Sequence, residues 1–441
     1  MTADRPLYAI VSKYNPNFGV PIVRYLWRSL SEKGRCLVLL AEDPHVPRNP
    51  AIDHLDFKVC PRVARFTGNR PLDFFIVRAN ELRYLLFATV HLRWRRARLT
   101  ACLALDEWSY TACVLSGIPF DRIVYYACEQ PAQLEYRKRS VLYGLRDHMV
   151  RKTMRRSALL VAPNRQRLRL IASAFRMPTE KTLVIRNAVP LRVSGAAPAE
   201  GIASEDADPR LTVFYQGRVS PHTCQDVLFR LIEAYHVRVR IIVAGYVRPG
   251  SEEEFRLNDY NQKGFATYLG SIPSSELDRY RRIAELSLVL WDGRVVRSLR
   301  YCEPNKLYEL IADGIPVICT PNPTLRELVA RHHIGWCLKD YDGGGLDEII
   351  EGILADPVVL ERIRSNCLAA ARETLNFEAQ AAPLLARVAA MSAPAAGPED
   401  LAARPPVRRM TPPVRPAASG ATRPKLDDAG TDRCKRNGTG P

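Results

Sequence analysis

The 441-residue chain has no apolar run long enough to cross a membrane, which takes about 18 residues. Its opening residues, MTADRPLYAIV, lack the basic stretch followed by an apolar stretch that marks a secretory signal. The eleven cysteines are scattered singly, without a C-x-x-C pair or a Cys/His cluster at zinc spacing. We therefore expect a cytoplasmic protein with reduced, mostly buried thiols and no bound metal or cofactor.

Several familiar catalytic signatures are also missing. The sequence contains no GxxxxGK[ST] phosphate loop, no GxSxG elbow and no GxGxxG dinucleotide motif. Phosphate hydrolysis, ester hydrolysis and hydride transfer thereby lose their usual support. Asp206-Ala207-Asp208 spells a metal-binding DxD motif, but no strand precedes it and we interpret it as chance.

Positive charge is concentrated in a few segments. The chain has 64 Lys and Arg against 47 Asp and Glu, a net charge of +17. Residues 137–169 hold eleven of these bases and one acid, and residues 78–98 hold six bases and one acid. This asymmetry predicts an anionic partner for the first half of the chain. No nucleic-acid-binding signature is present, so an anionic membrane surface is favoured over nucleic acid.

The segment from Leu82 to Arg96 leaves two interpretations open. Its apolar run beside arginines and Trp94 is typical of a helix that lies in a membrane interface. The same pattern also fits a buried helix with a basic, solvated end.

Apolar strand-like runs alternate with amphipathic helical segments twice along the chain, which predicts two parallel sheets covered by helices on both faces. In the first half, strands are expected at the start and over 36–43, 99–105, 123–129, 158–163 and 182–189. In the second half, they are expected over 210–218, 239–246, 266–273, 286–293, 315–321 and 334–338. The expected fold class is α/β, with two Rossmann-like domains that face each other across a ligand cleft.

The predicted domain boundaries follow shifts in composition. They are 1–190 for an N-terminal Rossmann-like domain, 191–209 for a linker, 210–376 for a C-terminal Rossmann-like domain, 377–391 for a helix returning to the first domain, and 392–441 for a disordered tail rich in Pro, Ala and Arg. Nine prolines between residues 393 and 441 support the prediction of disorder for the tail.

Residues 301–318 are the most informative segment. Pro304 suits the first position of a helix, so we expect free N–H groups at Asn305, Lys306 and Leu307. These groups and the helix dipole form a site suited to a phosphate, and the Lys306 ammonium adds positive charge. Glu309, about one turn onward, can accept hydrogen bonds from two sugar hydroxyls. A site that holds a phosphate beside a ribose would bind a nucleotide.

This segment resembles the PNKLxEYxAxGxPVI signature of retaining GT-B glycosyltransferases of family four. Further segments agree in order with the family's motifs: VYYACEQP, VIRNAVP, QGRVSPHTCQDVLFRLIEAY, RIIVAGY and ATYLGSIPSSELDRY. The resemblance covers about residues 7–390. It implies transfer of a sugar from a nucleotide-sugar donor to a hydroxyl acceptor, with retention of anomeric configuration and without a metal.

The resemblance also implies roles for donor-site residues. Arg218 occupies the position of the arginine that faces the donor diphosphate, with Gly217 and Ile272 in the same donor site. Glu309 occupies the position of the glutamate that holds the ribose. Arg218 and Lys306 are therefore the expected catalytic residues, because both would stabilise the departing diphosphate.

Two positions depart from the family pattern. The first glutamate of the motif would fall at Tyr301, with Glu303 as the nearest substitute, and the usual lysine would fall at Thr223. Lys306 is the predicted replacement for that lysine. These departures keep a second hypothesis open, a non-catalytic nucleotide-sugar-binding or scaffold protein on the same fold.

Acceptor-side candidates come from the first half of the chain. Gly19 lies where the family has a glycine-rich loop, although a simple turn before a helix explains it equally well. Asp106, Glu107 and Glu129 follow apolar strands and would face the cleft, where each could bind acceptor hydroxyls or instead form a helix cap or an ion pair. The acceptor is expected to be a glycan or lipid-linked precursor in polysaccharide biosynthesis, handled by a cytoplasmic, peripheral membrane enzyme.

Overall fold

The computed structural model describes residues 5–13, 21–42, 57–61, 70–129, 141–191, 208–295 and 297–391. These residues belong to one compact unit, Met1–Ala393. Gly19, most of the predicted linker, residues 137–140 of the basic segment and the predicted tail lie outside the described residues.

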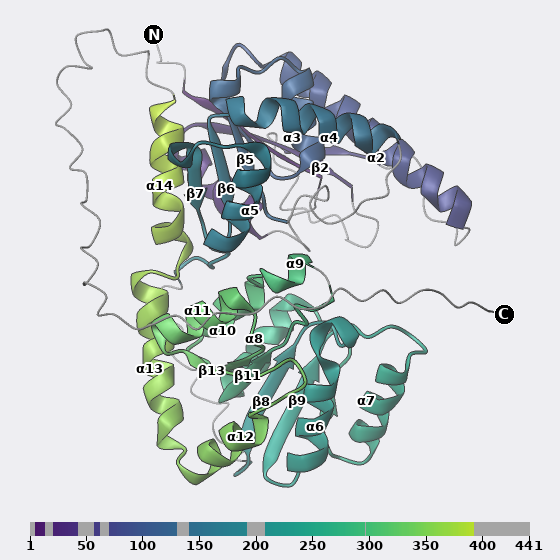
Figure 1. The fold of residues 1–441 in the computed structure, drawn as a ribbon, viewed down its shortest axis with the longest axis vertical. Helices are drawn as coiled ribbons and strands as arrows, with labels where there is room; N and C mark the ends of the chain where they lie inside the picture. Colours follow the sequence, from purple (N-terminus) through teal and green to yellow (C-terminus); the bar gives the residue numbers. More distant parts are fainter. Residues whose placement is uncertain are drawn as a thin grey trace, which may run out of the picture. The chain divides into compact units, whose positions relative to one another are not determined.

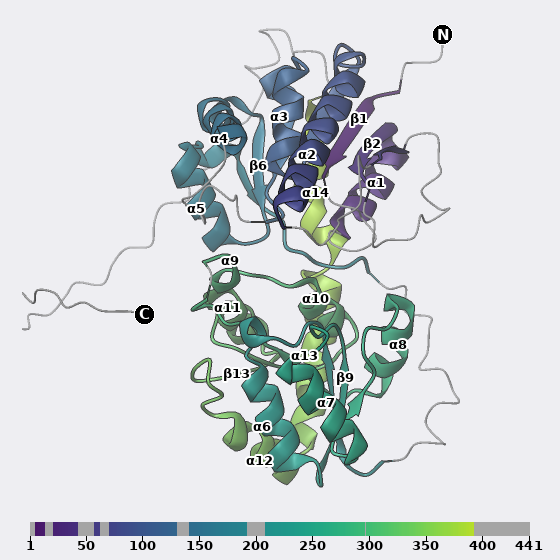
Figure 2. The same cartoon turned by 90° about the vertical axis from the view of Figure 1, so that its right-hand side faces the viewer.

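The first sheet has seven parallel strands in the order β3-β2-β1-β4-β5-β6-β7 (Figure 1). The strands are β1 (Leu7–Ser12), β2 (Arg35–Ala41), β3 (Phe57–Cys60), β4 (Leu99–Ala104), β5 (Ile123–Tyr126), β6 (Leu159–Ala162) and β7 (Thr182–Val184). The helices are α1 (Ile22–Lys33), α2 (Arg70–Arg93), α3 (Glu107–Leu115), α4 (Val141–Thr153) and α5 (Arg165–Phe175). Helices α2, α3 and α4 lie side by side over one face of this sheet (Figure 2).

Strand β1 shows why a nearly continuous apolar run forms the centre of this sheet. Ala9 and Val11 pack in the core beneath α2 and α3, whereas Tyr8 and Ile10 pack in the core that contains α1 residues. Because successive side chains of a strand point to opposite faces, a strand covered on both faces must be apolar at every position.

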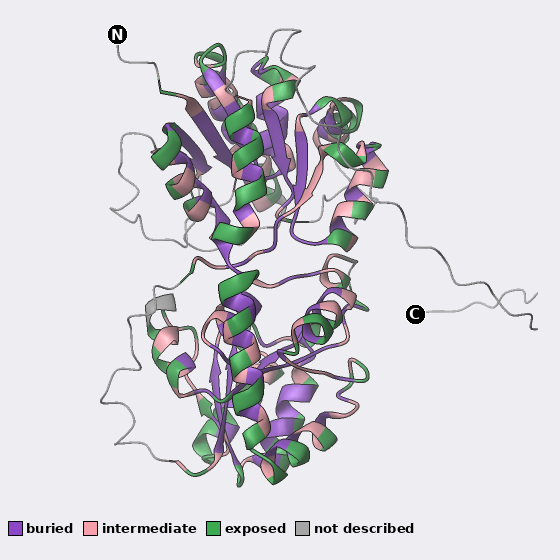
Figure 3. Ribbon diagram, turned by 90° about the vertical axis from the view of Figure 1, so that its left-hand side faces the viewer, coloured by how far each residue is buried: buried purple, intermediate pink, exposed green. Residues whose placement is uncertain are grey.

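The second sheet has six parallel strands in the order β10-β9-β8-β11-β12-β13. The strands are β8 (Leu211–Gln216), β9 (Val239–Ala244), β10 (Thr267–Tyr268), β11 (Leu286–Val289), β12 (Val317–Cys319) and β13 (Gly335–Cys337). The helices that follow or connect them are α6 (Gln225–Tyr235), α7 (Glu252–Gln262), α8 (Ser274–Ile283), α9 (Arg297–Arg300), α10 (Asn305–Ala312), α11 (Pro323–His332), α12 (Leu346–Ala355), α13 (Val358–Glu373) and α14 (Phe377–Ala390). Figure 3 shows the strands mostly buried and the helices exposed along one side.

Helix α14 returns to the first sheet. Its Phe377 ring lies 5.4 Å from the ring of Tyr25 on α1, and Leu384 and Val388 are buried in the same core. The chain therefore crosses from one sheet to the other twice, once between β7 and β8 and once before α14.

The expected α/β class with two Rossmann-like halves is confirmed by the two parallel sheets. Some elements differ from expectation. The strand expected over 266–273 is only Thr267–Tyr268, and Pro304 is the residue before α10 rather than its first residue, with φ −71° and ψ 142°.

Candidate functional site

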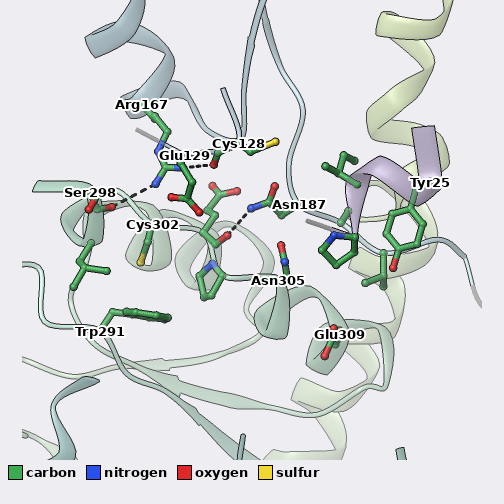
Figure 4. Close-up of a pocket in the computed structure, with 17 residues that line it drawn as sticks. Tyr25, Cys128, Glu129, Arg167, Asn187, Trp291, Ser298, Cys302, Asn305 and Glu309 are labelled. Atoms are coloured by element: carbon green, nitrogen blue, oxygen red, sulfur yellow. Dashed lines mark hydrogen bonds between the residues drawn. The ribbon is translucent and has the colours of Figure 1, made fainter. Parts of the chain in front are cut away.

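A pocket of about 290 Å³ is lined by residues that follow strands of both sheets (Figure 4). Cys128 and Glu129 follow β5, Asn187 follows β7, and Trp291 follows β11. The carboxyl ends of parallel strands are where open α/β sheets place their ligands. The described lining also includes residues of α1, α5, α9 and α10, so both halves of the chain build one pocket.

The N-terminus of α10 borders this pocket. Pro304, Asn305 and Glu309 all line it. Among the described residues, no hydrogen bond engages the N–H groups of Asn305 and Lys306, which leaves these donors available to an anion. The expectation of a third free group is wrong, because the Leu307 N–H donates to the Pro304 carbonyl at 3.1 Å and the Leu307 side chain is buried in the core.

Glu309 is held from one side. Its Oε2 accepts hydrogen bonds from Gln216 Nε2 and Arg281 Nη1, both at 3.1 Å. Arg281 is buried and also forms ion pairs with Asp278 and Asp313. Oε1 accepts no hydrogen bond within the described part of the chain. The carboxylate is therefore fixed through one oxygen while the other remains available to pocket hydroxyls.

The Lys306 ammonium is directed toward the end of β8. Nζ donates to the Gln216 carbonyl at 3.1 Å and lies 4.8 Å from the centre of the Tyr215 ring. Burial lowers the pKa of Lys306 from its usual 10.5 to about 8. Lys306 is not among the residues that line the pocket, so its charge lies beside Gly217 rather than next to Asn305.

The loop after β8 passes very close to the end of β9. A Cβ on Gly245 would lie 1.7 Å from the Gly217 carbonyl oxygen, and the Gly217 N–H donates to Ala244 O at 2.9 Å. Only glycine at position 245 allows this approach. Arg218, which follows Gly217, is exposed, and its guanidinium lies 5.2 Å from the centre of the Tyr246 ring. It does not line the pocket.

Thr223 and Ile272 are engaged by the hydrogen bonding and packing of the fold. The Thr223 hydroxyl is buried and donates to the carbonyls of Arg218 and Ser220, so no cation replaces the family's lysine at this position. Ile272 is half-buried and packs against the core beneath α10.

Glu303 lines the pocket, but both of its carboxylate oxygens have partners. Oε1 pairs with Arg186 Nη1, and Oε2 accepts from the Tyr308 hydroxyl at 2.6 Å. Burial raises its pKa to about 7, although the Arg186 charge opposes that shift. The Arg186 guanidinium and the Tyr308 hydroxyl occupy the positions on this carboxyl group that sugar hydroxyls would need.

The acceptor-side candidates are not brought together. Asp106 caps α3, with Oδ1 accepting from the N–H groups of Trp108 and Ser109 and Oδ2 accepting from the Lys13 N–H. Glu107 lies 3.9 Å from Arg146 in an ion pair. Of the described candidates, only Glu129 lines the pocket.

Sequence reasoning missed much of the pocket lining, including the side chains of Arg167, Asn187 and Trp291. Arg167 belongs to the basic segment that suggested a surface charge. The spacing of Arg167, Ile171 and Phe175, four residues apart, instead indicates that Arg167 shares a helix face with two apolar residues. All three lie on the buried face of α5.

The described residues contain no helix long and apolar enough to span a membrane. Within the same residues, no three or more His, Cys, Asp or Glu side chains gather as ligands for a metal ion.

Residues 202–373 match the family model described as Glycosyl transferases group 1. No curated protein sequence matches the chain.

Several solved structures share the fold. Anabaena HepE, in complex with UDP and glucose, is 16% identical with a TM-score of 0.63, over 87% of this chain and 99% of that one. Sucrose-phosphate synthase from Thermosynechococcus elongatus is 17% identical with a TM-score of 0.60, over 86% and 97% of the two chains. WaaG, a glycosyltransferase involved in lipopolysaccharide biosynthesis, is 13% identical with a TM-score of 0.60, over 86% and 98%.

These likenesses define the class: the chain has the GT-B glycosyltransferase fold. The family model matches residues 202–373, and the solved structures extend the likeness in fold to most of the chain.

Proposed function

We propose that the protein transfers a sugar from a nucleotide-sugar donor to a hydroxyl acceptor, with retention of anomeric configuration and without a metal ion. The observation that carries this proposal is the α10 N-terminus beside Glu309 in one pocket. The backbone N–H groups of Asn305 and Lys306 can donate hydrogen bonds to a diphosphate, and Glu309 Oε1 can accept hydrogen bonds from ribose hydroxyls.

In the proposed reaction, the bond between the anomeric carbon and the diphosphate oxygen breaks as a bond to the acceptor oxygen forms on the same face. The acceptor hydroxyl proton passes to the departing diphosphate. Arg218 and the α10 N-terminus would stabilise the negative charge that develops on this leaving group. Because Arg218 is exposed on the loop after β8, we propose that it turns toward the diphosphate when the donor binds.

A thermal-shift panel of UDP, GDP, ADP, CMP and their common sugar conjugates tests the donor site. A stabilising shift for one nucleotide, lost in Glu309→Ala, supports the proposal and names the donor class. No shift with any of them contradicts it.

The alternative is a nucleotide-sugar-binding protein without transfer activity. Two observations favour it: Thr223 holds no cation, and the oxygens of Glu303 are already engaged. Under this alternative a nucleotide sugar binds and no diphosphate is released.

We further propose that the enzyme acts at an anionic membrane surface on a glycan or lipid-linked acceptor in polysaccharide biosynthesis. Helix α2 has two apolar faces. Tyr84, Ala88 and Leu92 are buried against the first sheet, whereas Leu86 and Trp94 are 65% and 81% exposed. The buried side chains agree with the interpretation as a packed helix, and the exposed ones are those on which the proposed membrane contact would depend.

The exposed face of α2 combines apolar and basic side chains. Leu82 and Val90 extend the band formed by Leu86 and by Trp94, the residue after α2, and Arg93 and Arg96 near the end of the helix are exposed. Apolar residues that enter the headgroup region, with arginines that bind lipid phosphates, are typical of peripheral attachment to an anionic bilayer.

Co-sedimentation with vesicles tests this surface. We expect binding to phosphatidylglycerol-containing vesicles, little binding to phosphatidylcholine alone, and a loss of at least about tenfold in the double variant Leu86→Ser/Trp94→Ser. Phe255→Ser, which removes an exposed aromatic residue from α7, is the matched control. Equal binding of the two variants would contradict attachment through α2.

A further inference from the structure

Arg167 is a buried cation in the wall of the pocket. It comes from the first turn of α5, its side chain lines the pocket, and only 4% of the residue is exposed. Nη1 donates to the Cys128 carbonyl at 2.7 Å, and Nη2 approaches the Ser298 carbonyl at 3.4 Å. These are uncharged backbone acceptors.

The Nε donor of this guanidinium is unsatisfied. Arg167 Nε has no hydrogen-bond partner in the part of the chain that the structure describes. A buried donor without an acceptor is costly, and native proteins retain such groups mainly where a ligand, ion or water completes them. Figure 4 shows the guanidinium on the pocket wall, with its hydrogen bonds to Cys128 and Ser298 dashed.

Glu303, Glu309 and Lys306, further charged groups in or near the pocket, are bound by neighbouring protein groups. The Glu303 carboxylate is bound by Arg186 and Tyr308, and Glu309 is held through Oε2 by Gln216 and Arg281. Lys306 is directed toward Gln216, and Arg218 lies outside the pocket lining. Arg167, by contrast, lines the pocket and forms an ion pair with none of the carboxylates in the part of the chain that the structure describes.

We propose that Arg167 binds an anionic oxygen group of the donor, in place of the cation that is missing at Thr223. The inference rests on the proposed function, since it assigns a ligand to the same pocket. Two groups of a nucleotide sugar offer this chemistry: the diphosphate, and the carboxylate of a uronic acid. The guanidinium fork suits either one, because both present paired oxygen atoms.

This assignment makes donor binding depend on both halves of the chain. The α10 N-terminus belongs to the second sheet's half, and Arg167 belongs to the first. A donor anion held by both groups would join the halves around the ligand.

Calorimetric titration of Arg167→Gln, Arg167→Lys and wild type with UDP, UDP-glucose, UDP-glucuronic acid and uridine tests the proposal, with the corresponding guanosine series if UDP gives no thermal shift. Arg169→Gln is the matched control, because it removes an exposed arginine from the same helix. Far-UV circular dichroism and melting temperature establish that each variant is folded, and the lysine variant retains the charge if the glutamine variant does not fold.

If Arg167 binds the diphosphate, Arg167→Gln lowers the affinity for UDP, UDP-glucose and UDP-glucuronic acid about 10- to 100-fold and leaves the affinity for uridine unchanged. Arg167→Lys then recovers part of the lost affinity. If Arg167 binds a sugar carboxylate, only UDP-glucuronic acid is weakened. Wild-type affinity of Arg167→Gln for all of them, or an equal loss in Arg169→Gln, overturns the proposal.

A failure of the proposed function would look different. If no nucleotide binds the wild type, pyrophosphate and glucuronate are titrated alone. Binding that is lost in Arg167→Gln would then support the anion site without the nucleotide-sugar function, and an absence of binding would overturn both.

Discussion

Replacing Glu309 by alanine removes the carboxylate that is proposed to hold the donor ribose. Glu309 Oε1 would accept hydrogen bonds from two ribose hydroxyls. Each hydrogen bond to a charged group contributes about 1.5–3 kcal/mol. The substitution leaves no unpaired buried charge, because Arg281 keeps Gln216 Oε1, Asp278 and Asp313 as partners. We therefore expect a loss of about 3–6 kcal/mol in binding, or roughly 150- to 20,000-fold in affinity.

Isothermal titration with the nucleotide selected by the thermal-shift panel measures this loss directly. Asp313→Asn is a matched control, since it removes another carboxylate from Arg281 but lies outside the pocket lining. It should change affinity less than about threefold. Unchanged affinity in Glu309→Ala refutes the ribose assignment, and an equal loss in both variants would mean that Glu309 acts through Arg281 rather than by contact with the ligand.

Three further predictions concern the surroundings of the site. Gly245→Ala places a Cβ 1.7 Å from Gly217 O, so chemical denaturation should show a loss of at least about 2 kcal/mol, against about 1 kcal/mol for Gly250→Ala, whose φ is +72° but whose Cβ meets nothing within 4 Å. Similar losses in the two variants would contradict the close approach. The pKa of Lys306 falls from 10.5 to about 8 in the folded chain, so the unfolded chain binds more protons between these values and the free energy of unfolding should rise with pH across that window. Lys306→Met should abolish up to about 3 kcal/mol of that rise, measured by urea denaturation at pH 7.5 and 10.5, and an unchanged slope would show that Lys306 is not the titrating group. Arg186→Leu leaves the buried Glu303 carboxylate without its cation and should cost about 3–5 kcal/mol, while Arg186→Leu/Glu303→Leu should recover part of it; a double variant as unstable as the sum of the single variants would rule out the coupling.

Much of the fold was predictable because its strands are apolar on both faces. The run LTACLAL and the run IVYYACE, for example, lead to β4 and β5 at the centre of the first sheet. Elements with weaker patterns were missed. Helix α7 is largely polar and buries only Leu257 and Tyr260, and β3 has just four residues, of which only Cys60 is buried.

The site was predictable where local sequence determines geometry. The helix after Pro304 and the place of Glu309 on it follow from capping and helical spacing. The Leu307 error arose because the first turn closes a hydrogen bond to the Pro304 carbonyl, which residue type alone does not reveal. Arg167 was missed because its burial depends on contacts with Cys128 and Ser298, which are distant in the sequence.

Release of nucleoside diphosphate from a panel of nucleotide sugars tests the central claim most directly. The account predicts that wild type releases the diphosphate from one donor, with slow hydrolysis in the absence of an acceptor, and that Arg218→Ala reduces turnover more than donor affinity. If a nucleotide sugar binds tightly and wild type releases no more diphosphate than Arg218→Ala, the protein binds nucleotide sugars without transferring them, and the proposal of catalysis is wrong.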